Sequence, residues 1–496
     1  MNAVREQIGI ESIDAPASRG APVQRYTPLA VWVVVVLTLL FISLRIMSWG
    51  FVPAGDARRH VAKAFTDKAY TEIAVMRPEY TMDHSPGWEG LLRVVRRAAG
   101  WERDALMSFA LVFTMLCVLL APLPWLRRPE AWLAALLAKL AAEPDTYRIT
   151  QARPYLLTEA VLIAILFAWS GEESKRPGRW KVGLTVVGMA LSVWMHGAWY
   201  LWVLPLAAFF LAGRWRAGCW LTACWAAGTV GGAMLTGRPV EFLRQAVLIA
   251  ATISRQQVPQ WTLVGELQPD YRNFPVLLLV AVVALWRFQR DKSAKNVLGG
   301  PVFWLIAIGW ILGFKASRFW GDWGMAAVLV WLTVQLQEMM ANGFQANSWK
   351  RVAMAGLLAV PLFADSTNDL EGRYSYSLSE VHLDARDPAL AGWLPGPEGI
   401  FYSASMEFFD DTFYWNPQAN WRYIFGMEPA LMPKADRQIL ARIQVSHAAK
   451  DYEPWVQKMR PVDRLEITSA GQPNLPQLEW TNVAAQMWIG RLPKAK

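Results

Sequence analysis

A carboxylate stands just beyond the first long apolar run of the sequence. Residues 55–60 read Gly-Asp-Ala-Arg-Arg-His, so Asp56 follows a glycine, which allows a tight backbone turn. An acid beside a membrane helix can face an interfacial cavity without the full cost of burying a charge in hydrocarbon. Asp56 is therefore our first candidate catalytic residue, with Arg58 as an additional candidate beside it. The structural alternative is a solvated carboxylate that pairs with Arg58 or Arg59.

Two further carboxylates, Glu143 and Asp145, flank a proline after the third apolar run. Carboxylates at this spacing can point at one reacting hydroxyl or at one hard cation such as Mg²⁺ or Mn²⁺. Both are candidate catalytic residues, and together with Asp56 they are candidate metal ligands. The alternative is that they end one helix and cap the next turn.

A pair of cations, Lys315 and Arg318, lies three residues apart near the ninth apolar run. On one helical face the two could hold a phosphate, Arg by a bidentate fork and Lys as a point charge. We therefore predict that they bind a phosphate group. The alternative is that both side chains extend to lipid head groups.

Three more residues complete the candidate set: His84, His196 and Glu266. A histidine can act as a base or a ligand. The alternative for each is a structural role. The sequence has no CxxC motif or Cys/His cluster that would indicate another metal or a redox group.

The composition indicates what kind of molecule must position these groups. Of 496 residues, 54% are hydrophobic and 18% charged, and 28 are tryptophan, a residue that favours membrane–water interfaces. This excludes a disordered chain, a coiled coil, a disulfide scaffold and an ordinary soluble enzyme. The net charge of +9 is explained by Lys and Arg flanking membrane spans, so we expect no nucleic-acid partner. The sequence predicts a polytopic α-helical membrane protein embedded in a lipid bilayer.

Apolar runs predict about eleven transmembrane helices. Several runs are shorter than the ~20 residues that cross a bilayer unaided, so those helices must be tilted, extended by polar turns or partly inserted. The runs cover residues 30–51, 105–125, 131–142, 154–170, 183–195, 198–212, 219–235, 276–286, 302–314, 325–336 and 352–363.

The distribution of basic residues predicts how the protein is oriented in the membrane. With the N-terminus in the cytoplasm, most Lys and Arg of the short links lie on the cytoplasmic side, as in Arg127-Arg128 and Lys350-Arg351. The arginine-rich loop 52–103 lies outside and resists this rule, although long loops count less in it. An odd number of spans places the C-terminal segment outside, on the face that also carries the acids and the cation pair.

Two soluble regions are predicted on that outer face. Within the long first outer loop 52–103, residues 88–97 form an amphipathic helix whose arginines would lie along lipid head groups. Residues 365–496 form a separate soluble α/β domain, with a strand over 399–403 and a helix over 435–444.

This arrangement resembles the GT-C superfamily of membrane glycosyltransferases, which use polyprenyl-phosphate-linked sugars. The resemblance rests on Gly55-Asp56 in a long outer loop, the Glu143/Asp145 pair in the second, the spans and the C-terminal outer domain. It implies a GT-C-like catalytic domain over 1–364 and a periplasmic domain over 365–496. It also implies that Asp56 is the main catalytic acid, with Glu143 and Asp145 as a second acidic site. Lys315 and Arg318 would hold the carrier phosphate.

The expected activity is transfer of a sugar from a polyprenyl-(pyro)phosphate donor to a glycan, lipid or protein acceptor, at the periplasmic face of a bacterial inner membrane. The Trp-Trp-Asp motif of oligosaccharyltransferases is missing, and its nearest counterpart is Phe408-Phe409-Asp410. Two other readings stay open: a transporter or flippase for a lipid-linked sugar, and a non-catalytic scaffold subunit of the cell envelope. A transporter would carry ionisable residues near the middle of its spans.

Overall fold

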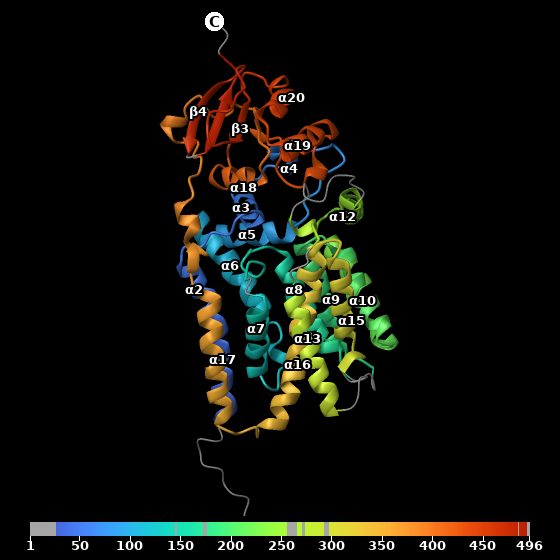
Figure 1. Ribbon diagram of the computed structural model, residues 1–496. Coiled ribbons are helices and arrows are strands. Elements are labelled where there is room, and N and C mark those ends of the chain that lie inside the picture. Colours follow the sequence, from blue (N-terminus) through green and yellow to red (C-terminus); the bar gives the residue numbers. More distant parts are fainter. Residues whose placement is uncertain are drawn as a thin grey trace, which may run out of the picture.

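The computed structural model describes residues 26–143, 146–171, 176–254, 265–269, 273–291, 297–484 and 486–493. The described chain is mostly helical and has one small sheet. Long helices run side by side in a bundle, and the C-terminal residues form a mixed unit at one end of it (Figure 1). Among the described residues, three stretches are long and apolar enough to cross a membrane: Thr27–Ser48, Arg103–Trp125 and Phe319–Gly343. The total of about eleven spans stays a prediction.

The helices of the bundle and of the first outer loop are bounded as follows: α2 (Thr27–Ser48), α3 (Asp56–Lys63), α4 (Tyr70–Ile73), α5 (Pro86–Ala99), α6 (Arg103–Leu120), α7 (Glu130–Ala142), α8 (Tyr155–Trp169), α9 (Arg179–Met195), α10 (Val203–Leu211), α11 (Trp215–Met234), α12 (Pro239–Ser254), α13 (Phe274–Asp291), α15 (Pro301–Gly313), α16 (Met325–Gly343) and α17 (Lys350–Thr367). A π-helical turn, η5 (Phe319–Gly324), leads into α16.

Helix α2 shows why these segments form a bundle. One side of the helix is fully buried against α6 and α17, and the other side is exposed yet equally apolar. A helix that is apolar all round is typical of a membrane span, because one face packs on protein and the other meets lipid. The buried stripe is Val31, Val35, Leu39, Ile42 and Ile46, and the exposed side has Val33, Leu37, Phe41 and Leu44.

Helices α3 and α5 lie across the end of the bundle, beneath the C-terminal unit (Figure 1). The predicted amphipathic segment is helix α5, which buries Trp88 and Leu92 completely. Arg96 differs from the expectation that these arginines lie along lipid head groups. Its Nη1 donates to the Ala64 carbonyl at 3.1 Å, and its guanidinium lies over the Phe65 ring. This arginine therefore fastens α5 to the end of α3.

The C-terminal unit contains all five described strands. They are β1 (Ile400–Tyr402), β2 (Arg422–Tyr423), β3 (Arg464–Thr468), β4 (Glu479–Ala484) and β5 (Met487–Arg491), with helices α18 (Met406–Trp415), α19 (Lys434–Ser446) and α20 (Glu453–Val456). The sheet order is β2-β1-β3-β5-β4, in which β1 is parallel to both neighbours and β5 is antiparallel to both of its own. Strand β1 and helix α19 confirm the two elements expected here.

The C-terminal unit and the first outer loop are joined by backbone hydrogen bonding. Ala74 forms a parallel bridge with Tyr423 of β2, and the Val75 amide donates to the Tyr423 carbonyl at 2.8 Å. Helix α17 continues to Thr367, two residues past the predicted boundary at 365. The division into domains 1–364 and 365–496 remains a prediction.

Candidate active site

A cavity of about 710 Å³ lies where the bundle end, the first outer loop and the C-terminal unit meet. Its polar end brings together side chains from widely separated parts of the chain. They are Asp56, Arg59, His60, Asp83, His84, Lys139, Glu143, Arg148, Arg153, His196, Glu266, Arg318, Glu407, Asp410 and Glu428. The candidates after the first, third and ninth apolar runs thus share one cavity.

The other end of the cavity is apolar and runs between the bundle helices. Its lining comes from α2, α6, α7, α16 and α17, which are packed on one another below the polar end. These residues are Ile42, Ile46, Met115, Val118, Leu119, Leu136, Leu140, Met325, Leu329 and Leu362. The cavity therefore suits a molecule with a charged or polar head and a long hydrocarbon chain.

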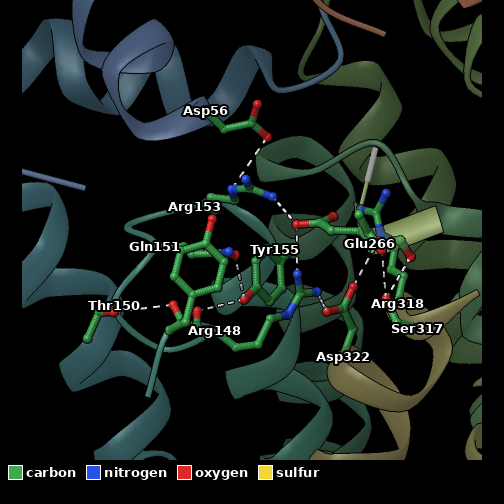
Figure 2. Close-up of polar contacts among 12 residues, drawn as sticks. Asp56, Arg148, Thr150, Gln151, Arg153, Tyr155, Glu266, Ser317, Arg318 and Asp322 are labelled. Atoms are coloured by element: carbon green, nitrogen blue, oxygen red, sulfur yellow. Dashed lines mark hydrogen bonds and ion pairs between the residues drawn. The ribbon is translucent and has the colours of Figure 1, made fainter. Parts of the chain in front are cut away.

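Asp56 is the first residue of α3, and Gly55 before it has φ +71°, a backbone conformation that favours glycine. The carboxylate pairs with Arg153 at 3.7 Å (Figure 2). It also pairs with Arg59, on the same face of α3, at 2.7 Å. Burial alone would raise the pKa of Asp56, but Arg59 and Arg153 outweigh burial and hold that pKa well below its usual range. Its position at a helix N-terminus also favours the charged form. Asp56 is therefore an ionised carboxylate at the polar end of the cavity.

Arg148 and Arg153 form the wall beside Asp56. They precede α8, and the Tyr155 hydroxyl fixes their loop by donating to the Arg148 carbonyl at 2.7 Å. Arg148 binds Glu266 at 2.7 Å and also pairs with Asp322, while Arg153 pairs with the same Glu266 oxygen (Figure 2). Burial would raise the pKa of Glu266, but Arg153 and Arg148 lower it.

Arg318 lies beside η5, across the cavity. Its Nε donates to Asp322 at 3.1 Å, and its Nη2 lies 3.1 Å from His196 Nε2. The His84 and His196 rings pack edge to face, with their centroids 5.3 Å apart. Burial and the Arg318 charge lower the pKa of His84 to about 4, so that this histidine is neutral near pH 7. Arg318 Nη1 makes no hydrogen bond with the described residues, so this nitrogen is available to bind an anion.

The wall opposite the bundle comes from the C-terminal unit. Asp410 of α18 is 1% exposed, and its nearest cation is Arg59, 3.7 Å away. Neither oxygen of Asp410 accepts a hydrogen bond from the described residues. Glu143 stands at the bundle side, with its carboxylate 3.9 Å from Lys139 Nζ.

The structure places the predicted site residues in three groups. Those that line the cavity are Asp56, Glu143, His84, His196, Glu266 and Arg318. Lys315 is exposed and is absent from the lining, and Arg58 is buried in ion pairs with Glu380 and Asp411, also away from the cavity. Asp145 lies outside the described residues.

The local backbone explains why Lys315 and Arg58 lie away from the cavity. Residues 314–315 form a turn between α15 and η5, so Lys315 and Arg318 do not share a continuous helix. On α3, Arg59 is one turn from Asp56, whereas Arg58 points toward the C-terminal unit. The expected pairing of Asp56 with an arginine is therefore made by Arg59.

Arg148, Arg153, Asp322 and Asp410 are not among the predicted site residues. Arg148 and Arg153 stand in the link between two apolar runs, where the sequence shows them only as basic residues. Asp322 could have been found, because it stands four residues after Arg318 in a Gly-Asp-Trp-Gly stretch, at ion-pair spacing. No local signal connects Asp410 with the rest of the site.

A divalent metal does not fit the described residues well. Among them, no group of three His, Cys, Asp or Glu side chains is placed to hold a metal ion. Both oxygens of Asp56 face guanidinium groups, Oδ1 that of Arg59 and Oδ2 that of Arg153. A dication there would meet like charge on both sides. Since Asp145 lies outside the described residues, the predicted metal site of Asp56, Glu143 and Asp145 is left untested.

Comparison with known protein families and with curated proteins finds no match to the chain. Among solved structures, it is similar to ArnT from Cupriavidus metallidurans, solved bound to undecaprenyl phosphate, with a TM-score of 0.53 and 13% identity. That match covers 94% of this chain and 98% of ArnT. An oligosaccharyltransferase from Archaeoglobus fulgidus, solved in complex with Zn and sulfate, matches with a TM-score of 0.46 and 10% identity over 88% of this chain and 68% of its own. The likeness to ArnT confirms the predicted fold: this chain has the GT-C fold.

Proposed function

We propose that this protein is a membrane glycosyltransferase that moves a sugar from a polyprenyl-phosphate donor to an acceptor on the outer face of a bacterial inner membrane. The observation that carries the proposal is the shape and lining of the cavity. One end holds an ionised carboxylate among arginines, and the other is an apolar channel between bundle helices. A lipid-linked sugar phosphate has the same division into a charged head and a hydrocarbon tail.

The donor would lie with its tail between α2, α6, α7, α16 and α17 and its phosphate near Arg318. Arg318 Nη1, which makes no hydrogen bond with the described residues, suits a phosphate oxygen, and Lys139 lies at the same polar end. The complex of ArnT with undecaprenyl phosphate supports a lipid phosphate as ligand of this fold. With the N-terminus in the cytoplasm, the cavity and the C-terminal unit would face the periplasm.

In the reaction, an acceptor hydroxyl attacks the anomeric carbon while the bond between that carbon and the phosphate oxygen breaks. The electron pair of the broken bond stays on the polyprenyl phosphate, and Arg318 stabilises the charge that develops there. The Asp56 carboxylate accepts a hydrogen bond from the acceptor and orients it.

Asp56→Asn tests this role directly. We expect transfer to fall by about 10²-fold, since a neutral amide neither orients the acceptor through a charged hydrogen bond nor balances the charge of the arginines. Thermal unfolding of the purified variant should stay close to wild type, which separates a catalytic defect from misfolding. Asp384→Asn, which alters an exposed pair with Arg386, is the control and should leave transfer unchanged. Full transfer by Asp56→Asn would refute the assignment.

Arg318→Ala tests the phosphate site. Lys315→Ala is a matched control, because Lys315 is a cation three residues earlier that does not line the cavity. We expect the apparent donor KM to rise by about tenfold or more for Arg318→Ala and to stay unchanged for Lys315→Ala, since a charge-assisted contact contributes about 1.5–3 kcal/mol. Equal effects of both variants would contradict the assignment. Binding of the donor without transfer by wild type would instead favour a transporter.

A further inference from the structure

A histidine lies one helical turn from Asp56 on the same helix. His60 is on α3, lines the same cavity and is 5% exposed. Its Nδ1 lies 3.3 Å from Oε1 of Glu89, which is 3% exposed and belongs to the first turn of α5. Residues four apart on a helix share a face, so Asp56 and His60 face the cavity together.

Glu89 is held as the fixed partner of this histidine. The Tyr70 hydroxyl donates to the same Glu89 carboxylate, and Asp83 hydrogen-bonds to it as well. Burial and the neighbouring Glu89 raise the pKa of Asp83 well above its usual range. The N-terminus of α5 further favours negative charge on Glu89.

This arrangement determines which histidine nitrogen is basic. With Nδ1 donating to the Glu89 carboxylate, the lone pair lies on Nε2. Nε2 makes no hydrogen bond with the described residues and is not among the atoms sealed from the cavity. The pair therefore has the geometry of an oriented base, in which a buried carboxylate holds the imidazole and supports the positive charge that it gains.

We propose that His60, positioned by Glu89, takes the proton of the acceptor, while Asp56 orients the acceptor and stabilises the charge that develops on it. The inference rests on the proposed transfer reaction and assigns its proton step. Two arginines stabilise the charged form of Asp56, which makes that carboxylate a weak proton acceptor. His60 has its Nε2 open to the same space.

The surroundings of His60 keep its imidazole ring neutral. Burial and Arg59 lower the pKa of His60 to about 4, whereas Asp56 and Asp83 act in the opposite direction, and Arg153 lowers it further. The ring is therefore neutral near pH 7 and able to accept a proton. Once protonated, it lies beside the Glu89 carboxylate.

The acceptor oxygen bonds to the anomeric carbon, and its hydrogen moves to His60 Nε2. The bond from that carbon to the phosphate oxygen breaks, and its electron pair leaves with the polyprenyl phosphate. The imidazolium then returns the proton to water, which restores the enzyme.

The test uses the full chain in detergent or nanodiscs with a polyprenyl-phosphate sugar that wild type transfers. We expect His60→Ala to lower kcat by about 10²–10⁴-fold with an unchanged donor KM. Added imidazole should restore part of the rate, and the restored rate should rise with the fraction of neutral imidazole. Loss of kcat without rescue in a folded protein, or full activity without imidazole, would overturn the proposal.

Two further variants separate chemistry from structure. His60→Asn keeps a donor for Glu89 but provides no base, so it should fold like wild type and lose kcat as His60→Ala does; an active His60→Asn protein would overturn the proposal. Glu89→Gln should lower kcat less, and adding it to His60→Ala should cause little further loss, since the two residues act as a unit. Fully additive losses would contradict the dyad. Absence of transfer by wild type, in contrast, would refute the proposed function itself.

Discussion

Asp410 is a buried carboxyl group whose protonation depends on the charged residues around it. It comes from the C-terminal unit and faces Arg59 and the Asp56 carboxylate, yet neither of its oxygens has a hydrogen-bond donor among the described residues. Burial raises the pKa of Asp410 to about 7, and the nearby Asp56 adds to this, although Arg59 opposes it. The two aspartates are thus driven in opposite directions by their surroundings, a pattern that is typical of catalytic sites.

Replacing this residue gives a prediction about stability. Because the pKa of Asp410 is higher in the folded than in the unfolded chain, the folded state binds the proton more tightly. Stability from this group is therefore present below about pH 4 and is lost as the pH rises to about 7. Asp410→Asn avoids that loss, so its Tm should exceed that of wild type by a margin that grows from pH 4 to pH 7, on the order of a few degrees.

Thermal unfolding of both proteins across this pH range measures the effect. Asp384→Asn is the control, because Asp384 forms an exposed pair with Arg386 that lowers its pKa. It should give no gain at any pH. A constant difference between Asp410→Asn and wild type would show that Asp410 is ionised in the folded protein throughout.

At the scale of elements, the turn before α3 sets the position of Asp56. Gly55 has φ +71°, and a Cβ added there would lie 3.5 Å from Arg153 Nη2 and 3.8 Å from Asp410 Oδ2. Gly100, which ends α5, has a similar φ of +66° but open space around it. Both positions therefore carry backbone strain, but only a side chain at residue 55 would contact the site.

Gly55→Ala and Gly100→Ala should both lose stability by roughly 1–3 kcal/mol, the cost of a positive φ in a residue with a Cβ. Only Gly55→Ala should also lower transfer, on the order of 10- to 100-fold, because a shift of about 1 Å in a catalytic group can cost 100-fold. Unfolding and transfer assays on both variants provide the comparison. Equal transfer rates would show that the turn does not control the placement of Asp56.

At the scale of the whole molecule, the cavity is lined both by helices of the bundle and by residues of the C-terminal unit. Leu362 on α17 is 4% exposed and lines the apolar end, whereas Leu357 on the same helix is 75% exposed. The two leucines lie on one helix but differ in burial. The same Leu→Trp substitution at each position therefore tests the proposed tail channel.

Leu362→Trp should narrow the apolar end and weaken binding of a long polyprenyl phosphate, by about tenfold if two or so buried methylene contacts are lost. A short-chain analogue should bind as it does to wild type. Leu357→Trp should change neither affinity. Loss of long-chain and short-chain binding together would indicate general overpacking of the core, which costs about 1–3 kcal/mol.

The sequence alone determined the properties that depend on local pattern. Composition and apolar runs predicted a helical membrane protein, Gly55-Asp56 predicted a turn that presents an acid, and periodicity predicted α5, β1 and α19. These follow from residues that are close in the chain. The family resemblance supplied the fold, which the likeness to ArnT confirms.

Only the tertiary structure decided which charges meet. Arg153 reaches Asp56, Glu89 reaches His60, and Asp410 approaches Arg59 across long separations in the chain, which no spacing rule describes. The break in the helix at residues 314–315 turned Lys315 away from Arg318. Such pairings depend on the rotation of each helix in the bundle and on where the C-terminal unit docks, because a side chain's partner is set by packing between elements.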